Sequence, residues 1–224
     1  GSYNIGIGQS AGGAITTGQK NTLMGFGAGD ATTTADNNTA VGYDALTANT
    51  TGTRNVAVGA LALDANTTAS NNNAVGYSAM SANTTGAGNQ AFGDSALAAN
   101  TTAANNTAMG NFAMSANTTG FDNVAVGAIA LDANTTGNSN TAVGYGSLSA
   151  DTLGDRAVAI GKNALIAQNF TSTTDNYNTA VGYGTGAAVT TGVNNTLIGG
   201  LAGDATTTGT GNTAVGNESL GANT

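Results

Sequence analysis

The chain has 224 residues, of which 7% are charged and 35 are glycine, and its formal net charge at pH 7 is −8. It contains no His, Cys, Trp or Pro, so it lacks the side chains most often used in acid–base catalysis, thiol chemistry and transition-metal sites. Four basic residues against twelve acidic ones are too few to neutralise a row of phosphates, and no apolar run approaches the length of a membrane span. We therefore expect no enzyme, cofactor, intrinsic metal, nucleic-acid partner or membrane insertion.

A unit of 17 residues repeats along the chain. With the Asn of "NTAVG" taken as position 0, copies begin at residues 4, 21, 38, 55, 72, 89, 106, 123, 140, 157, 178, 195 and 212. Every step is 17 residues except the step from 157 to 178, which is 21, so one copy carries a four-residue insertion near residues 168–172. Residues 1–224 are predicted to be a single repeat array.

Several positions keep one residue type from copy to copy. Position 3 is apolar in every copy, position 8 is Leu or Met in nine, and position 12 is Thr in every copy once the insertion is allowed for. Position 4 is Gly in all thirteen copies and position 0 is Asn in all but Ala157; examples are Gly42, Gly59 and Gly76, and Asn38, Asn55 and Asn72. If the copies stack, the apolar positions become a continuous core, Asn and Thr form side-chain ladders, and Gly supplies positive φ at bends.

Within each copy, alternation at positions 1–5 and 8–12 predicts two short strands. The chain contains no Asn-Gly or Asp-Gly dipeptide, the usual mark of tight antiparallel hairpins. The pattern therefore favours an all-β fold, a parallel β-roll or β-solenoid of about thirteen 17-residue coils.

The core of one such coil is small. Two large apolar side chains per copy contribute roughly 1.5–3 kcal/mol each when buried, whereas ordering each backbone residue costs about 1–2 kcal/mol. Small residues at positions 2, 4, 7 and 10 would let a second sheet approach closely, inside a coil or between chains. We therefore expect a homo-oligomer.

The core motif "N-x-A-V/I-G-x-x-A", as in residues 38–45, 55–62 and 123–130, resembles the head repeats of trimeric autotransporter adhesins. The longer line "NTAVGYxALxANTTG", clearest at residues 38–52, is similar to repeat arrays of bacteriophage tail-fibre proteins. The resemblance covers essentially the whole chain. It implies a left-handed parallel β-roll, three chains about one axis, and an extracellular fibre that attaches to a host surface protein or glycan.

Two sets of residues are candidates for receptor contact. Aromatic residues recur at position 5, and the set comprises Tyr43, Tyr77, Tyr145 and Tyr183, with Phe26 at the same position. Their alternative role is packing across a subunit seam or over a neighbouring Gly. The insertion adds Asn169 and Phe170, because loops on rigid scaffolds often carry function, although a loop without function is at least as consistent with the sequence.

Ice binding is the competing function. The Thr column at position 12 and the mostly Thr column at position 13 would present regular hydroxyls if they lay on a flat face. Thr-Thr followed by Gly or Ala is, however, also typical of a turn. The sequence therefore predicts an extracellular fibre segment, homotrimeric or filamentous, with an ice-binding β-solenoid as the alternative.

Overall fold

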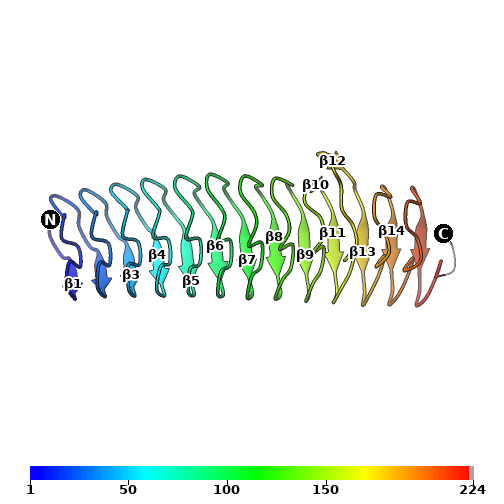
Figure 1. Ribbon diagram of the computed structural model, residues 1–224, viewed down its shortest axis with the longest axis horizontal. Coiled ribbons are helices and arrows are strands. Elements are labelled where there is room, and N and C mark those ends of the chain that lie inside the picture. The colour runs from blue at the N-terminus through cyan, green and yellow to red at the C-terminus, as the bar shows by residue number, and fades with distance from the viewer. Residues whose placement is uncertain (222–224) are drawn as a thin grey trace. The chain divides into compact units, whose positions relative to one another are not determined.

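A computed structural model of the chain describes residues 1–221, in which the backbone winds in coils with one three-residue strand per repeat (Figure 1). Contacts divide the chain into two units, Gly1–Asn111 and the part from Phe112 onward. Each unit is a stack of parallel coils, which confirms the predicted all-β solenoid. Ala222 and Thr224, at positions 10 and 12 of the last copy, lie outside the described residues.

The first unit contains seven strands that pair side by side in chain order. They are β1 (Ile5–Ile7), β2 (Thr22–Met24), β3 (Thr39–Val41), β4 (Val56–Val58), β5 (Asn73–Val75), β6 (Gln90–Phe92) and β7 (Thr107–Met109). Each pair is parallel and in register, so that equivalent positions of successive copies are partners, as in Thr39 with Val56.

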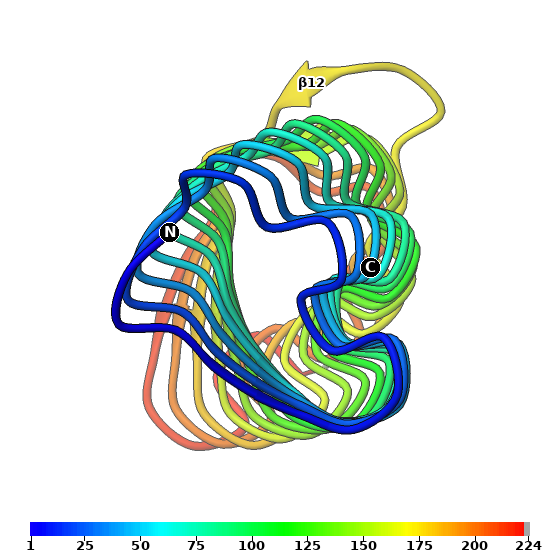
Figure 2. The ribbon, with the colours of Figure 1, turned by 90° about the vertical axis from the view of Figure 1, so that its left-hand side faces the viewer.

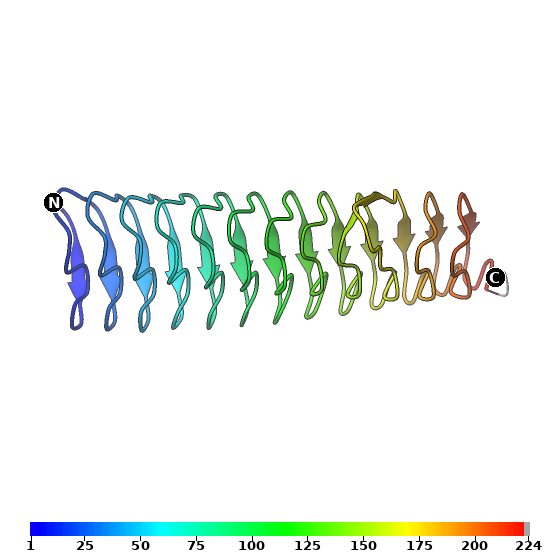
Figure 3. The same ribbon diagram turned by 45° about the horizontal axis from the view of Figure 1, so that its top comes forward.

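The second unit continues the same pattern, as Figure 3 shows for its green-to-red coils. Its main sheet contains β8 (Val124–Val126), β9 (Thr141–Val143), β11 (Val158–Ile160), β13 (Thr179–Val181), β14 (Thr196–Ile198) and β15 (Thr213–Val215). Val158 pairs with Thr179 across the insertion, so the four extra residues leave the strand register intact. The insertion contributes β12 (Thr174–Asp175), which pairs with β10 (Gly154–Asp155) outside the main sheet.

The expectation of two strands per copy was wrong, because positions 6 to 12 form a turn. Asp44 and Leu46, at positions 6 and 8, have φ of 50° and 57°, in the left-handed region that strands do not use. Hydrogen bonds between coils nevertheless continue through this turn. The Leu46 N–H donates to the Ala62 carbonyl at 2.9 Å and the Ala48 N–H to the Asp64 carbonyl at 3.0 Å.

The invariant glycine at position 4 ends each strand. Gly42 has φ of 143° and Gly59 of 132°, values that residues with a Cβ rarely adopt. A Cβ on Gly59 would also overlap the carbonyl of Gly76 in the next coil. Both the backbone conformation and the close stacking of coils therefore require glycine at this position.

The core lies inside the coils, and position 3 is not part of it. From β2 onward the middle residue of each strand in the main sheet, position 2, is buried, whereas positions 1 and 3 face outward, as in the burial of Ala57 between Val56 and Val58. The interior is filled by small residues at positions 2 and 7 and by Leu or Met at position 8. The prediction that position 3 forms the core was wrong because side chains alternate across a strand, and the coil is narrow enough that Ala occupies the inner side.

Coils that lack Leu at position 8 keep the core filled in another way. Gly186 and Gly203 occupy position 8 of successive copies, and the second of these copies has Leu197 instead of Ala at position 2. A Cβ on Gly186 or Gly203 would lie 3.0 or 2.8 Å from a Leu197 methyl carbon. Leu197 therefore fills the space that the two glycines leave, and Leu23 does the same beside Gly12 and Gly29 in the first unit.

Candidate functional site

The Asn column at position 0 forms a buried ladder through each stack. The Asn55 N–H donates to Asn38 Oδ1 at 2.9 Å, and the Asn72 N–H donates to Asn55 Oδ1 at 3.0 Å. The side-chain amide also spans its own coil, since Asn38 Nδ2 donates to the Gly52 carbonyl at 2.9 Å. A second Asn ladder runs at position 11, where Asn66 Nδ2 donates to Asn49 Oδ1 at 2.9 Å. These Asn residues are buried and structural.

The Thr column at position 12 is also used internally. Thr50 Oγ1 donates to the Thr67 carbonyl at 3.1 Å, and Thr135 Oγ1 donates to the Thr152 carbonyl at 3.1 Å. Position 13 is different, because Thr51, Thr68 and Thr85 are exposed. Of the two Thr columns proposed for an ice face, the first is therefore partly used in the fold and the second is free to meet solvent.

The insertion lies in the copy that lacks Asn at position 0, and Figure 2 shows it projecting from the coils as the yellow segment that carries β12. Ala157 has no side-chain oxygen to accept the next N–H of the ladder. Asn176, from the inserted segment, takes over this role, and its Oδ1 accepts the Asn178 N–H at 2.9 Å. The missing Asn and the insertion are therefore one structural feature, a connection that the sequence alone did not reveal.

A buried polar cluster lies beneath the insertion. Gln168 Nε2 donates to the Asp151 carboxylate at 2.7 Å, and Gln168 Oε1 accepts from Asn178 Nδ2 at 2.8 Å. The N–H groups of Gly154 and Phe170 also donate to Asp151, at 3.1 and 3.3 Å. Burial raises the pKa of Asp151, and these hydrogen bonds offset part of that shift.

The two residues proposed as contacts in the insertion have different environments. Asn169 is exposed, and its Oδ1 accepts from Thr152 Oγ1 at 3.0 Å. Phe170 is only 5% exposed, and one of its ring carbons lies close to Gly154. Phe170 therefore packs against the coil and is not available on the surface.

The insertion also presents exposed polar and aromatic groups that the repeat pattern did not indicate. Arg156 forms an ion pair with Asp175 and lies 5.8 Å from the centre of the Tyr177 ring. The Tyr177 hydroxyl donates to Asp175 at 3.3 Å. Arg156 and Tyr177 each stand directly before position 0 of a copy, so stacking brings them together, and Asp175 joins them from the longer loop. The column before position 0 was not among the conserved columns of the repeat, so it gave no signal for these residues.

The four candidate tyrosines at position 5 all lie on the surface. Tyr43, Tyr77, Tyr145 and Tyr183 are between 53% and 58% exposed. Tyr43 stacks on Phe26, with ring centres 5.5 Å apart and an angle of 9°, and a hydrogen bond with Asp44 raises its pKa.

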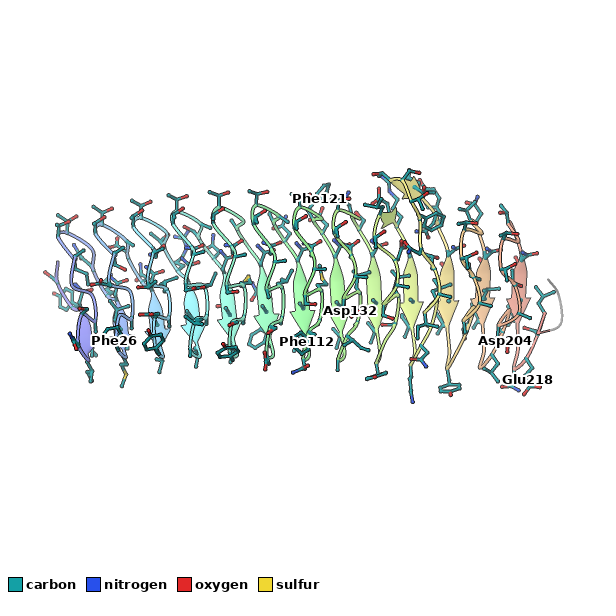
Figure 4. The ribbon with its side chains drawn as sticks, in the orientation of Figure 1. Phe26, Phe112, Phe121, Asp132, Asp204 and Glu218 are labelled. Carbon is teal, nitrogen blue, oxygen red and sulfur yellow. The ribbon has the colours of Figure 1, made fainter. Side chains whose placement is uncertain are left out.

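Large apolar residues also occur at the next position in four copies whose position 5 is not aromatic. This set at position 6 contains Leu61, Phe112, Ile129 and Leu201. Figure 4 shows Phe112 at the edge of its coil where the strand ends, whereas Phe121 lies at the opposite edge. In most coils, therefore, one bulky apolar side chain lies just after the glycine that ends the strand.

Residues 1–221 contain no helix with the length and hydropathy of a membrane span. Over the same residues, no three acidic side chains gather as a metal would require. Comparison with known protein families, with curated proteins and with solved structures found no match.

Proposed function

We propose that this chain is a non-enzymatic segment of an extracellular fibre, of the kind found in bacterial surface adhesins and phage tail fibres. In this proposal it acts as a homotrimer that extends a binding surface away from its carrier and attaches to a host surface protein or glycan. The resemblance of residues 38–52 to the repeats of such fibres supports the extracellular location.

The observation that carries the proposal is the in-register repetition of the surface. Because each coil pairs with its neighbour at the same positions, a residue at position 5 recurs at nearly the same place on successive coils. Four such places hold a tyrosine that is more than half exposed. Repeated weak contacts of this kind combine through effective concentration, which is how a fibre without a deep pocket attaches to a surface.

The attachment surface is tested by binding of the purified chain to a glycan array and to a panel of immobilised extracellular proteins. The test variant replaces Tyr43, Tyr77, Tyr145 and Tyr183 with Ala, and the control replaces Thr51, Thr68, Thr85 and Thr191 with Ala. Loss of about 1 kcal/mol per contact predicts a fall in binding of more than tenfold for the tyrosine variant only. Equal binding by both variants would refute the proposed contact residues.

Ice binding remains the second candidate because the exposed Thr residues at position 13 recur from coil to coil in the first unit. This function predicts thermal hysteresis in a nanolitre osmometer, abolished by the same position-13 control variant. Thermal hysteresis together with no binding to the protein and glycan panels would replace the fibre proposal by this one.

A further inference from the structure

The outer surface of the strands has an unusual composition for a protein surface. From β2 onward the middle residue of each strand in the main sheet, Ala or Leu, faces the interior, while position 3, always Val, Ile, Met or Phe, faces outward. Phe92, Met109 and Ile198 are 39%, 45% and 40% exposed. Most of the exposed large apolar residues of the described chain lie at positions 1 to 6, and the exceptions are Tyr3, Phe121 and Tyr177. We call the outward positions 1 and 3 of the strands the strand face.

The strand face carries no charge. The chain has four basic and twelve acidic residues, yet none of them occupies position 1 or 3 in any of the thirteen copies. The charges nearest in sequence follow the strands at positions 5 and 6, in Asp44, Asp94, Lys162 and Glu218, or precede them at position 16, in Lys20, Arg54, Asp122 and Arg156. The strand face is thus an uncharged strip, apolar at position 3 and mostly Thr or Val at position 1, and such a strip on an otherwise acidic chain indicates an interaction surface.

The strip is large enough for a stable interface. One coil contributes about 50 Å², since strands are about 4.8 Å apart and three residues span about 10 Å. The seven coils of the first unit and the six of the second together give roughly 600 Å² per chain, and about 1,200 Å² when the faces of two chains meet, which is the lower end of the range for specific interfaces.

The chemistry of the strip selects its occupant. A partner must present an uncharged surface that repeats at the strand spacing, and a second copy of this chain does so in each of its two units. The acidic remainder of the surface repels another copy, so the strand face is where two copies meet most favourably. Ice is a poorer fit, because side chains at position 3 range in size from Val58 to Phe92 and present no regular lattice.

We propose that the strand face of this chain is covered by the strand faces of the other copies of the same chain in the assembly. This inference deepens the proposed fibre and rests on its homo-oligomeric assembly, for which it names the contact surface. In this arrangement the side chains at position 3, which point out of their own coil, form the buried centre of the interface between chains. The tyrosines at position 5 lie at the edge of that interface.

The test places charges on the strand face without placing them on adjacent coils, where they would repel one another. The test variant is Val41→Glu, Val75→Glu, Val126→Glu and Val181→Glu. The matched control carries Thr51→Glu, Thr85→Glu, Thr136→Glu and Thr191→Glu, at position 13 of the same four copies. Sedimentation equilibrium measures the mass, with 21.4 kDa as the mass of one chain, and circular dichroism checks the fold.

We expect the wild type and the control to sediment as oligomers and the strand-face variant as a folded monomer, with an association constant more than about a hundredfold lower because unpaired charges would be buried. A wild type that is monomeric over a roughly 100-fold range of concentration would overturn the inference. It would do so even if ice or another protein proved to bind the strand face. Oligomers that persist in the strand-face variant would overturn it too.

A second variant covers the case in which the charged chain fails to fold. Replacing the same four valines with Thr keeps the side-chain shape and the β propensity but puts a hydroxyl into the interface. It is expected to be folded and to associate at least tenfold more weakly than the wild type, whereas unchanged association would count against the inference. Mass and attachment are separate readouts, so an oligomer that binds none of the glycan and protein probes would sink the proposed function alone.

Discussion

Asn134 and Asp151 occupy the same position in successive coils, yet the buried Oδ1 of Asn134 has no hydrogen-bond partner within residues 1–221. Earlier in the column Asn amides donate to the Asn of the preceding coil, as Asn66 Nδ2 does to Asn49 Oδ1 and Asn134 Nδ2 to Asn117 Oδ1, at 2.9 and 2.8 Å. A carboxylate has no hydrogen to donate. The position-11 ladder therefore stops at Asp151, which instead accepts hydrogen bonds from Gln168 and from the backbone beneath the insertion.

The buried carboxyl predicts a pH-dependent stability. Burial raises the pKa of Asp151 above its ordinary value of 3.8, so the folded state binds this proton more tightly than the unfolded state. The contribution of Asp151 to the free energy of unfolding is therefore most favourable below pH 3.8. It is lost as the pH rises from 3.8 through the raised pKa of the folded state. Asp151→Asn removes the effect, and its stability relative to the wild type should increase with pH by about 1.4 kcal/mol per unit of pKa shift.

Urea denaturation at pH 3, 5 and 8 measures this difference. Asp94→Asn is the control, since Asp94 is an exposed carboxylate. A difference between Asp151→Asn and the wild type that stays constant from pH 3 to pH 8 would contradict the assignment of a raised pKa.

Because position 4 requires glycine, Gly199→Ala is expected to destabilise the fold much more than the same substitution at the next residue, Gly200. Gly199 has φ of 130°, and a Cβ on it would overlap the Gly216 carbonyl, so Gly199→Ala should lower the unfolding free energy by about 3 kcal/mol or more. Gly200→Ala places its Cβ against only a side-chain oxygen, at 3.0 Å, at a position where another copy has Ala60, and should change stability by less than about 1 kcal/mol. Thermal unfolding of the two variants gives the comparison, and equal losses would be inconsistent with it.

Because Leu fills the same space from either position 2 or position 8, substitutions at Leu197 and Gly203 should have strongly coupled effects on stability. Leu197→Ala should cost about 2–5 kcal/mol because it leaves a cavity. Gly203→Leu should cost about 1–3 kcal/mol because the new side chain meets Leu197. The double variant recreates the arrangement of the central coils, with Ala inside the strand and Leu at position 8 with φ near 60°, and should lose less than the sum of the single losses.

A double-mutant cycle from urea denaturation quantifies this coupling. Residual space beside Gly186 keeps the double variant somewhat below the wild type. Additive effects of the two substitutions would show that Leu197 does not fill the space above Gly203.

The role of Asn176 predicts a cost for its removal. Asn176→Ala leaves the buried Asn178 N–H without its acceptor, which should reduce stability by about 1–3 kcal/mol. Asn169→Ala, in the same insertion, removes only a hydrogen bond at an exposed site and should cost less than about 0.5 kcal/mol. Hydrogen exchange at the Asn178 backbone amide reports the local effect. If Asn176→Ala leaves the protection of this amide unchanged, Asn176 does not take the place of the Asn that is missing at position 0.

The sequence by itself determined the coil length, the register and the stacking of like on like, because a strict period leaves only one way to pair thirteen copies in parallel. It also indicated which copy is irregular, through Ala157 and the step of 21 residues. It did not reveal that these two irregularities compensate each other, since the bond between Asn176 and Asn178 depends on the path of the inserted loop.

Only the tertiary structure decided which face of each strand is inside. Alternation shows that positions 2 and 3 point in opposite directions, and hydrophobicity alone would place Val58 inside and Ala57 outside. The folded chain does the reverse, because left-handed residues such as Leu61 and Leu63 turn the backbone so sharply that Leu63 fills the narrow interior and leaves room only for a methyl group beside it. The direction of that turn follows from the packing of the closed coil and not from the residue pattern of one strand, which is why the strand face emerged only from the structure.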